Sequence, residues 1–312
     1  MTLAPDAEID ERSAAEPEAS AVMADDVWYH EDEHGWVRQY QTWAGDGVLL
    51  INEENDLDPS AWHYALNEGY GLGISSQGAY RRRVRGNDQV VDSNTGFLRF
   101  SGDEVGVEHF VGGPGSVTFL GIDPAICPGF FEEIATVPTF TVTSEMTLTH
   151  LRLVRAQASG ADDITLETLA LNLLKAAVEQ HHAGISSYSR RTTGESRRRL
   201  VAEACELLHP PERKLGLVQI GRTIGCSPFH LSRVFHEITG MTIPQYRKRL
   251  RIHDALRRLN NGERDLATIA VASGFADHSH MTRSIVAQYG DPPSRLRELM
   301  QAYVASARMI PG

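Results

Sequence analysis

The chain has 312 residues, which is enough for about two domains with cores of their own. Its formal net charge is −11, a value that by itself argues against binding to nucleic acid. Its three cysteines are widely spaced and odd in number, which argues against a disulfide framework. We recognise no signal peptide and no membrane span, and therefore expect a cytoplasmic protein without a membrane partner.

The charge is distributed unevenly along the chain. From Ser186 onward there are 20 Lys and Arg against 11 Asp and Glu, a balance of +9. Residues 1–185 have 10 against 30, a balance of −20. Because contacts to phosphate need lysine or arginine where a protein meets DNA, the basic part is a candidate DNA-binding domain joined to an acidic one.

The first 160 residues divide into a tail and a β-rich domain. Residues 1–26 are acidic and poor in large apolar residues, so we predict a disordered tail. From Trp28 to about Phe140, short alternating runs are separated by turn clusters such as GND at 86–88. This pattern predicts an antiparallel β-barrel or sandwich over residues 27–160, with helices after it, and hence an α+β fold.

The interior of such a barrel is the expected place for a small-molecule effector. Tyr80, Arg82 and Phe97 are candidates for lining it. The alternation in YRRRVR also fits an exposed edge strand protected by charge, and we favour that interpretation for the arginines. A protein partner, or a second copy of the chain, could equally use an apolar face of the sheet.

A β-barrel can also hold a catalytic metal ion, and such a site needs histidines and carboxylates at characteristic spacings in the sequence. The histidines and the glutamate of the β-rich domain are scattered along the chain, and isolated histidines are more often structural than metal-ligating. Nor does any Ser/His/Asp or Cys/His set have a recognisable local context. We therefore expect no metal site, no cofactor and no enzymatic activity. The residues in question are His30, His34, His63, Glu108 and His109.

Residues 161–183 predict an amphipathic helix with more apolar surface than one contact covers. Leu166, Leu169 and Leu173 lie along one side of it. We expect part of the helix to pack on the barrel and these leucines to pair with a second chain in a homodimer. The alternative is full burial within one chain. Residues 184–196 are polar and rich in Gly, Ser and Thr, as in a linker.

The stretch GCSPFHLSRVFHEITG at 225–240 predicts a helix that begins abruptly. Ser227 can cap the helix and Pro228 suits its first position. Leu231, Val234 and Phe235 recur at three- and four-residue steps and form an inward stripe. Because residues 217–224 carry another helical stripe just before the glycine, the segment predicts a helix-turn-helix unit.

A second copy of this pattern follows about fifty residues later. HSHMTRSIVAQYG parallels HLSRVFHEITG, so that Arg283 corresponds to Arg233 and Gly290 to Gly240. Between the copies, residues 245–259 contain neither glycine nor proline and predict one connecting helix. At 1.5 Å per residue it spans roughly 20–25 Å, the scale needed to hold two units near successive turns of a DNA groove.

These residues resemble the AraC/XylS family of bacterial transcription regulators. The motifs are SPFHLSRVFHEITGMTIPQYRKRLRI and IAVASGFADHSHMTRSIVAQYGDPPSRLR, within residues 197–299. The second departs from the family pattern at Ile285, usually phenylalanine, and at DPP. The resemblance implies a double helix-turn-helix DNA-binding domain over residues 197–312 and a cupin-like amino-terminal barrel that binds an effector.

Carried over by position, the resemblance also implies which side chains face DNA. Arginine can bond guanine bidentately, and serine, histidine and aromatic side chains also contact base edges. The alternative for each is a phosphate contact or a solvated surface position. The implied base contacts are Phe229, Ser232 and Arg233 from the first unit and His278, Ser279, His280 and Arg283 from the second. Arg247, Lys248 and Arg251 of the connecting helix are candidates for phosphate contacts.

The sequence thus predicts a transcription regulator that binds double-stranded DNA, with RNA polymerase as a candidate further partner. A small-molecule effector or a protein partner would act at the barrel. Two alternatives remain at this point. One is a cupin-type metalloenzyme with an accessory DNA-binding module, and the other is an architectural or partner-binding protein without an effector.

Overall fold

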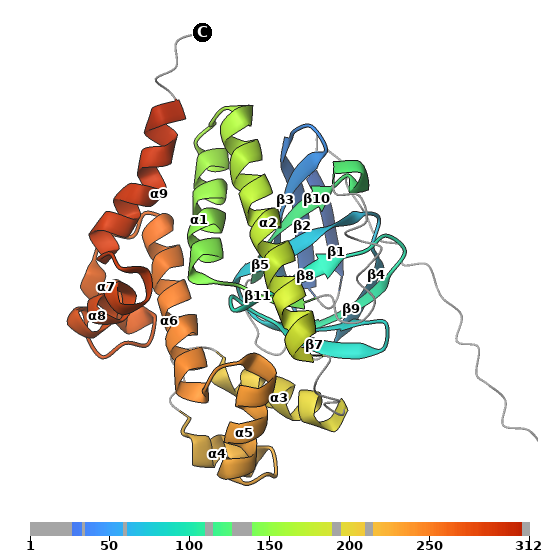
Figure 1. Cartoon of the computed structure of the whole chain (residues 1–312), viewed down its shortest axis with the longest axis vertical. Helices are drawn as coiled ribbons and strands as arrows, with labels where there is room; N and C mark the ends of the chain where they lie inside the picture. Colours follow the sequence, from blue (N-terminus) through green and yellow to red (C-terminus); the bar gives the residue numbers. More distant parts are fainter. Residues whose placement is uncertain are drawn as a thin grey trace, which may run out of the picture.

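A computed structural model describes residues 27–32, 35–58, 61–109, 115–126, 139–188, 195–209 and 215–307. The amino-terminal part is rich in sheet and the carboxy-terminal part is helical, which confirms the α+β prediction (Figure 1). The predicted tail and Cys127 lie outside the described residues.

The strands form two antiparallel sheets. The larger sheet has the order β1-β2-β3-β10-β5-β8-β11 and the smaller one β4-β9-β6-β7. The sheets do not close into a barrel, so of the two predicted architectures, barrel or sandwich, two sheets with open edges fit the sandwich. The strands are β1 Val27–Asp32, β2 Gly35–Ala44, β3 Val48–Leu57, β4 Trp62–Leu66, β5 Tyr70–Gln77, β6 Tyr80–Val84, β7 Asn87–Val91, β8 Thr95–Arg99, β9 Glu104–His109, β10 Gly115–Ile122 and β11 Thr139–Thr141, and a short 3-10 helix, η1, spans Pro124–Ile126.

Strand β6 shows where the sequence interpretation needs correction. It lies inside the smaller sheet, between β9 and β7, and is not an edge strand. Its burial alternates, so that Tyr80, Arg82 and Val84 point inward while Arg81 and Arg83 are half-buried on the other face. Arg82 is only 1% exposed. The alternation was read correctly, but a period of two does not say which face is buried.

Two helices cover the larger sheet. Helix α1, Ser144–Ala158, was not predicted, and α2, Asp163–Tyr188, packs beside it (Figure 1). Helix α2 continues beyond residue 183 into the predicted linker, and the next described residue, Glu195, begins α3. The sheet and the two helices share one core, which includes Leu72, Leu98, Leu120 and Leu153.

The leucines expected at a dimer interface lie in this core. Leu166, Leu169 and Leu173 are 3%, 4% and 1% exposed and pack within the same chain. Their proposed role in pairing two chains is therefore wrong, because a side chain already covered by its own core has no apolar surface left to bury. Full burial within one chain, the alternative, describes these three residues.

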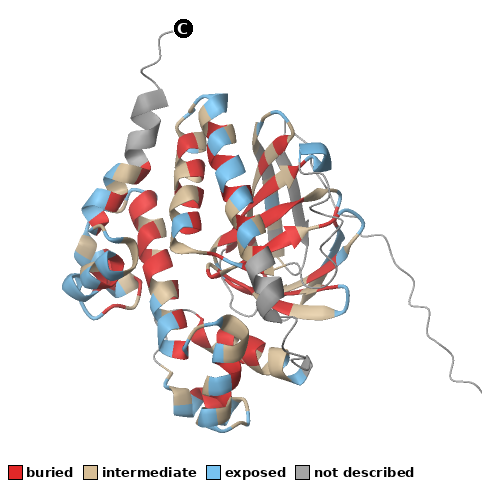
Figure 2. Cartoon of the chain, in the orientation of Figure 1, coloured by how far each residue is buried: buried red, intermediate tan, exposed pale blue. Residues whose placement is uncertain are grey.

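The carboxy-terminal helices form two small cores that share one helix. Helix α6 contributes Ile243, Tyr246 and Leu250 to the first core and Ile252, Leu256 and other residues to the second. Figure 2 shows the buried stripe that runs along α6. The predicted connecting helix is thus confirmed. The helices are α3 Glu195–Leu208, α4 Leu217–Thr223, α5 Pro228–Thr239, α6 Ile243–Asn260, α7 Leu266–Ala272, α8 His278–Tyr289 and α9 Pro293–Ala307.

The amino-terminal part packs against both helical cores. Asp92, in the turn between β7 and β8, accepts hydrogen bonds from Tyr246 and from His209 Nε2, the latter at 3.0 Å. On the other side, Leu151 of α1 belongs to the second helical core. Gln288 Nε2 of α8 also donates to Ser144 Oγ at 3.3 Å. Each helix-turn-helix unit therefore has its own contact with the sheet domain.

Two buried histidines at this junction give the stability of the protein a pH dependence. Burial lowers the pKa of His150 to about 4. Burial, followed by the charge of Arg249, lowers the pKa of His253 to about 3. Both values lie below the ordinary pKa of about 6.5, so the stabilisation is complete above that pH and is lost as pH falls toward the folded values.

We therefore expect the free energy of unfolding to fall by about 1 kcal/mol per histidine between pH 7 and pH 5.5. Urea unfolding at the two pH values measures the change. The double variant H150Q/H253Q should lose most of this pH dependence. An equal drop in the variant and the parent would assign the effect to other groups.

Candidate nucleic-acid interface

The first helix-turn-helix unit consists of α4 and α5. The Ser227 hydroxyl accepts from the backbone N–H of His230 at 3.2 Å, and Pro228 occupies the first helical position, so the helix begins where the sequence predicts. Gly225 has φ +73° in the turn, a conformation that glycine adopts without strain. A Cβ on Gly221 would lie 2.8 Å from the Cys226 carbonyl oxygen, so only glycine lets the two helices approach this closely.

The second unit, α7 and α8, repeats the same local chemistry. Asp277 Oδ1 accepts from the His280 backbone N–H at 2.7 Å, and Gly274 takes φ +78° in the turn. Helices α5 and α8 are each twelve residues long and end at a left-handed glycine, Gly240 and Gly290. The predicted repeat is therefore present in the structure. The turn of the second copy is one residue longer, because two residues separate Gly274 from the Asp277 cap and one separates Gly225 from the Ser227 cap.

The Asp277 cap should contribute measurably to the stability of the protein. Its carboxylate bonds to the backbone N–H of His280, which holds the pKa of Asp277 below its ordinary value. Loss of a cap of this kind leaves a backbone N–H of α8 without its acceptor, so Asp277→Ala should measurably lower the melting temperature. Thermal unfolding followed by circular dichroism measures it. Asp277→Ser, which keeps a capping oxygen, should stay near the parent, and an equal loss in both variants would contradict the assignment.

The residues expected to contact bases lie on the outer faces of α5 and α8. Phe229 is 79% exposed, although it is a large apolar side chain. Behind them, Leu231 and Met281 are fully buried at corresponding positions, which orients both helices alike. The interface set comprises Phe229, Arg233, His278, Ser279, His280 and Arg283, all exposed, and Ser232, which is half-buried.

The two arginines at corresponding positions differ in their surroundings. Arg233 Nε lies 3.5 Å from Glu237 Oε1, and Glu237 Oε2 accepts from Arg197 Nη1 of α3 at 3.3 Å. Glu237 therefore limits the rotamers of Arg233, while the Arg233 side chain stays 54% exposed. Arg283 is exposed and lies near enough to Asp277 to lower the pKa of that carboxyl, after the backbone hydrogen bonds. Glu237 was not among the predicted site residues, although its i, i+4 spacing from Arg233 is the sequence signal for such a pair.

The basic residues of α6 have different roles. Lys248 is exposed, and Arg251 is half-buried. Arg247 donates to the Leu215 carbonyl oxygen before α4, and burial, followed by the charge of Arg251, lowers its pKa. Arg247 therefore supports the first unit structurally, in addition to any contact with phosphate.

Among the described residues, no group of three or more His, Cys, Asp or Glu side chains is arranged to hold a metal ion. His63 and His109 lie near each other in the smaller sheet, where burial, followed by the charge of His63, lowers the pKa of His109 to about 4. In the same described part of the chain, no helix is long and apolar enough to cross a membrane.

Comparisons with known proteins agree with this arrangement. A family model described as a helix-turn-helix domain matches residues 220–299. The HTH-type transcriptional activator RhaS of Pectobacterium carotovorum is 37% identical over 67 residues, which cover 22% of this chain and 24% of that protein. The bifunctional transcriptional activator/DNA repair enzyme AdaA of Bacillus subtilis is 28% identical over 86 residues, or 28% of this chain and 41% of that protein.

Among solved structures, fatty-acid-bound ToxT of Vibrio cholerae is 13% identical with a TM-score of 0.33, over 83% of this chain and 98% of that one. The sequence matches to RhaS and AdaA span only a quarter and two fifths of those proteins. The family model, at residues 220–299, spans helices α5 to α8 and so covers most of the two helix-turn-helix units described above. The carboxy-terminal part of this chain therefore carries a helix-turn-helix domain of the AraC type.

Proposed function

We propose that this protein is a sequence-specific transcription regulator whose helices α5 and α8 enter adjacent major grooves of double-stranded DNA. We assign to the site residues the roles that the family resemblance implies. Residues on the exposed faces of α5 and α8 would contact bases. Arg247, Lys248 and Arg251 would contact phosphate. The protein would act in the cytoplasm, where chromosomal DNA and RNA polymerase are both within reach.

The observation that supports the proposal best is the matched geometry of the two units. Each recognition helix begins at a side-chain cap, ends at a left-handed glycine and turns its polar face away from its own core. The sheets and α1 contact α3, α6 and α9, and Gln288 near the end of α8 bonds to Ser144, so the proposed DNA-facing residues remain exposed in the same arrangement.

Selection of genomic fragments by the full-length protein tests this function directly. We expect enriched fragments to share two short motifs about one helical turn of DNA apart. Footprinting at low salt, with heparin as competitor, then measures preference for those fragments. No enrichment, or equal displacement from every duplex by heparin, would contradict a sequence-specific role.

We further propose that an effector binds between the two sheets, at the cluster of Tyr80, Arg82 and Phe97. Tyr80 and Phe97 pack edge to face with ring centroids 6.5 Å apart, and the Arg82 guanidinium lies 4.7 Å above the Phe97 ring. Burial lowers the pKa of Arg82 to about 10. Its two hydrogen bonds, to Gln89 Oε1 and the Leu98 carbonyl, are long at 3.4 and 3.5 Å, so a closer acceptor would be favoured.

A thermal-shift screen with metabolites tests for such an effector. A ligand that raises the melting temperature of the parent but not of Phe97→Leu would support the inter-sheet site. An absence of any shift would favour the protein-partner alternative. The enzyme alternative is tested separately by elemental analysis, since stoichiometric iron, zinc or manganese in the purified protein would support it.

We also propose a homodimer, which suits paired DNA half-sites. With the core leucines excluded, the outer face of α2 remains, where Ile164 and Leu171 are 78% and 40% exposed. Sedimentation at micromolar concentration decides between the states, and a monomer would contradict the proposal. We propose that residues 27–188 form the sensing part of the chain and residues 195–307 the DNA-binding part.

A further inference from the structure

The first recognition helix carries a carboxylate where neither the helix nor DNA favours one. Glu237 lies in the last turn of α5, close to its end at Thr239. The helix dipole places partial negative charge at this end, so a carboxylate here is unfavourable. Glu237 also follows Arg233 by four residues, which puts both side chains on the same face of the helix. In the proposed complex that face meets the phosphates, which repel a negative charge. The position of Glu237 therefore requires a partner that offsets both costs.

Two arginines contact this carboxylate. Arg233 Nε lies 3.5 Å from Glu237 Oε1, and Arg197 Nη1 of α3 donates to Glu237 Oε2 at 3.3 Å. The Glu237 side chain is 29% exposed, whereas that of Arg233 is 54% exposed. A carboxylate that is also bonded to α3 is the better fixed member of the pair. It restrains Arg233 at Nε and leaves the N–H groups of both terminal guanidinium nitrogens available to another acceptor.

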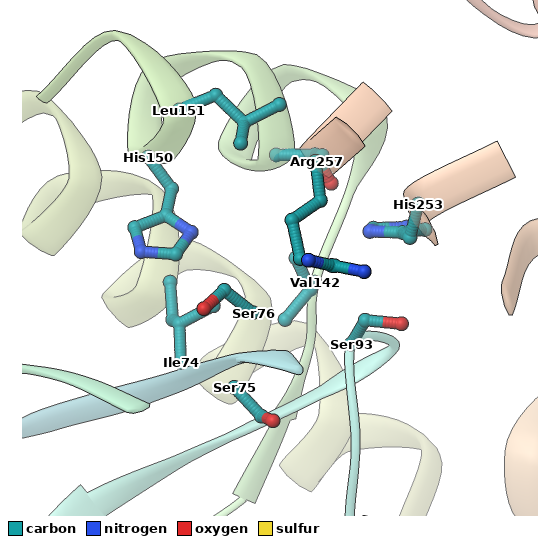
Figure 3. Close-up of a pocket in the computed structure, with 10 residues that line it drawn as sticks. Ile74, Ser75, Ser76, Ser93, Val142, His150, Leu151, His253 and Arg257 are labelled. Carbon is teal, nitrogen blue, oxygen red and sulfur yellow. The ribbon is translucent and has the colours of Figure 1, made fainter. Parts of the chain in front are cut away.

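A carboxylate shared by two arginines also occurs on α6, in different surroundings. Asp254 accepts from Arg257 Nη2 at 2.6 Å and from Arg258 Nε at 2.8 Å. Both arginine side chains are mostly covered, and Arg257 reaches into the recess between α1 and α6, on the side that faces the sheet domain (Figure 3). That cluster supports the packing of α6. Arg233, by contrast, is held by a carboxylate while its outer side stays open to solvent.

The second recognition helix lacks this arrangement. Arg283 of α8 corresponds to Arg233, and the residue four positions after it is Ala287, which is exposed and has no carboxylate. Asp277 acts on Arg283 through its charge, but its carboxylate already accepts from the backbone at the start of α8. The two arginines therefore differ in how strongly they are restrained, although their positions correspond.

We propose that Glu237 is a positioning residue that makes the first unit read one guanine strictly, while the second unit accepts more than one base at the corresponding position. This role rests on the proposed function, because it requires that Arg233 and Arg283 contact bases. Glu237 itself touches no base. It acts through Arg233, whose terminal N–H groups are the ones that bond O6 and N7 of guanine.

A restrained arginine discriminates better for two reasons. An arginine loses side-chain entropy when it is fixed on a base, and Glu237 imposes part of that loss before DNA binds. A restrained guanidinium is also less able to turn to a phosphate or a neighbouring base when the guanine is replaced, so the wrong sequence leaves its N–H groups without acceptors. Arg283 is less restrained and can exchange one acceptor for another. The operator should therefore have one strict and one tolerant half.

Selection of random duplexes by the full-length parent, E237Q and A287E tests this role. We expect the parent to select a nearly invariant guanine in the half that R233A relaxes. The matching position in the half that R283A relaxes should be mixed. E237Q should turn the strict position into a mixed one. A287E supplies the second unit with a carboxylate at the corresponding position and should make that unit stricter.

The possible outcomes separate this role from the proposed function. A parent that selects no motif contradicts both. A parent that selects a motif which E237Q leaves unchanged overturns only the role of Glu237. In an R233A background, E237Q should have no further effect on base preference, because Glu237 acts through Arg233. An effect there as large as in the parent would also overturn the proposal.

Affinity measurements distinguish positioning from a purely structural role. Replacement of the strict guanine by adenine should lower the affinity of the parent about tenfold more than that of E237Q. The affinity of E237Q for an unrelated duplex should equal that of the parent or exceed it, because a negative charge near the phosphates has been removed. If Glu237 only joined α5 to α3, both E237Q and R197Q would lower the melting temperature and weaken binding to every duplex alike. That result would overturn the proposal.

Glu203→Gln is the matched control for E237Q. Glu203 Oε1 accepts from Arg199 Nε at 3.1 Å on α3, so the variant removes the same charge from another arginine–glutamate pair at i, i+4 spacing. Neither side chain belongs to the proposed interface. E203Q should leave the base preference of both halves unchanged. An equal loss of preference in E203Q and E237Q would assign the effect to overall charge and overturn the role of Glu237.

Discussion

The double variant R233A/R283A should lose nearly all preference for its operator while remaining folded. Each arginine that bonds a guanine bidentately contributes about 1–3 kcal/mol to discrimination, so removal of both should lower specific affinity by roughly 30-fold to 20,000-fold. Neither side chain belongs to a core, since both are exposed on the recognition helices. Electrophoretic mobility shifts with the selected operator at fixed salt measure the change.

The control for this variant is R199A, in which an equally flexible basic side chain is removed elsewhere. Arg199 is 81% exposed on α3 and pairs with Glu203, away from both recognition helices. Its removal should change affinity little and uniformly across sequences. The single variants R233A and R283A should each relax base preference in a different half of the operator. Unchanged footprints and affinity in the double variant would remove both arginines from the interface.

The second large effect is expected at the domain junction, for Asp92→Ala. Asp92 is fully buried and accepts from His209, Tyr246 and the backbone N–H of Asn94. Burial alone would raise its pKa, but the hydrogen bonds from His209 and Tyr246 outweigh burial and hold the pKa below its ordinary value. The variant leaves a buried hydroxyl and a buried imidazole without their acceptor, which should cost about 3–5 kcal/mol.

Chemical denaturation measures the loss of stability, and hydrogen exchange shows in which helices or strands it occurs. We expect the helices around α3 and α6 to lose protection before the large sheet does, so that one transition separates into two. Asp88→Ala is the matched control, because Asp88 lies on the same hairpin but pairs with the partly exposed Arg83. It should cost less than about 1 kcal/mol. A single transition at the parental denaturant concentration in Asp92→Ala would show that the junction does not depend on this carboxylate.

The helix-turn-helix units were predictable because their signals are local. A cap, a proline or a left-handed glycine acts within four residues, and the inward stripe of α5 follows from a period of 3.6. Helix α1 was missed although its cap was present in the sequence, where Thr143 accepts from the Met146 backbone N–H. The stripe behind this cap includes polar residues such as Thr147 and His150, which are buried but do not read as apolar.

The sheet topology and the junction could not be predicted in the same way. Strand β10 pairs with β3 and β5, far away along the chain, and that choice depends on packing rather than on any local residue. The same holds for Asp92, whose partners His209 and Tyr246 lie 117 and 154 residues away. For the candidate site, exposure of the residues proposed to contact bases followed from the helical period. The contact between Glu237 and Arg233 and the inward direction of Arg82 could be identified only in the folded chain.

Helix α6 belongs to two cores at once, and this imposes a strict length on it. One inserted residue would rotate everything after it by about 100° and advance it by 1.5 Å. In the proposed complex, helix α8 would then point away from the duplex while helix α5 still contacted it. Evolution can lengthen the surface loops of such a protein without harm, but α6 tolerates no insertion or deletion unless DNA recognition changes with it.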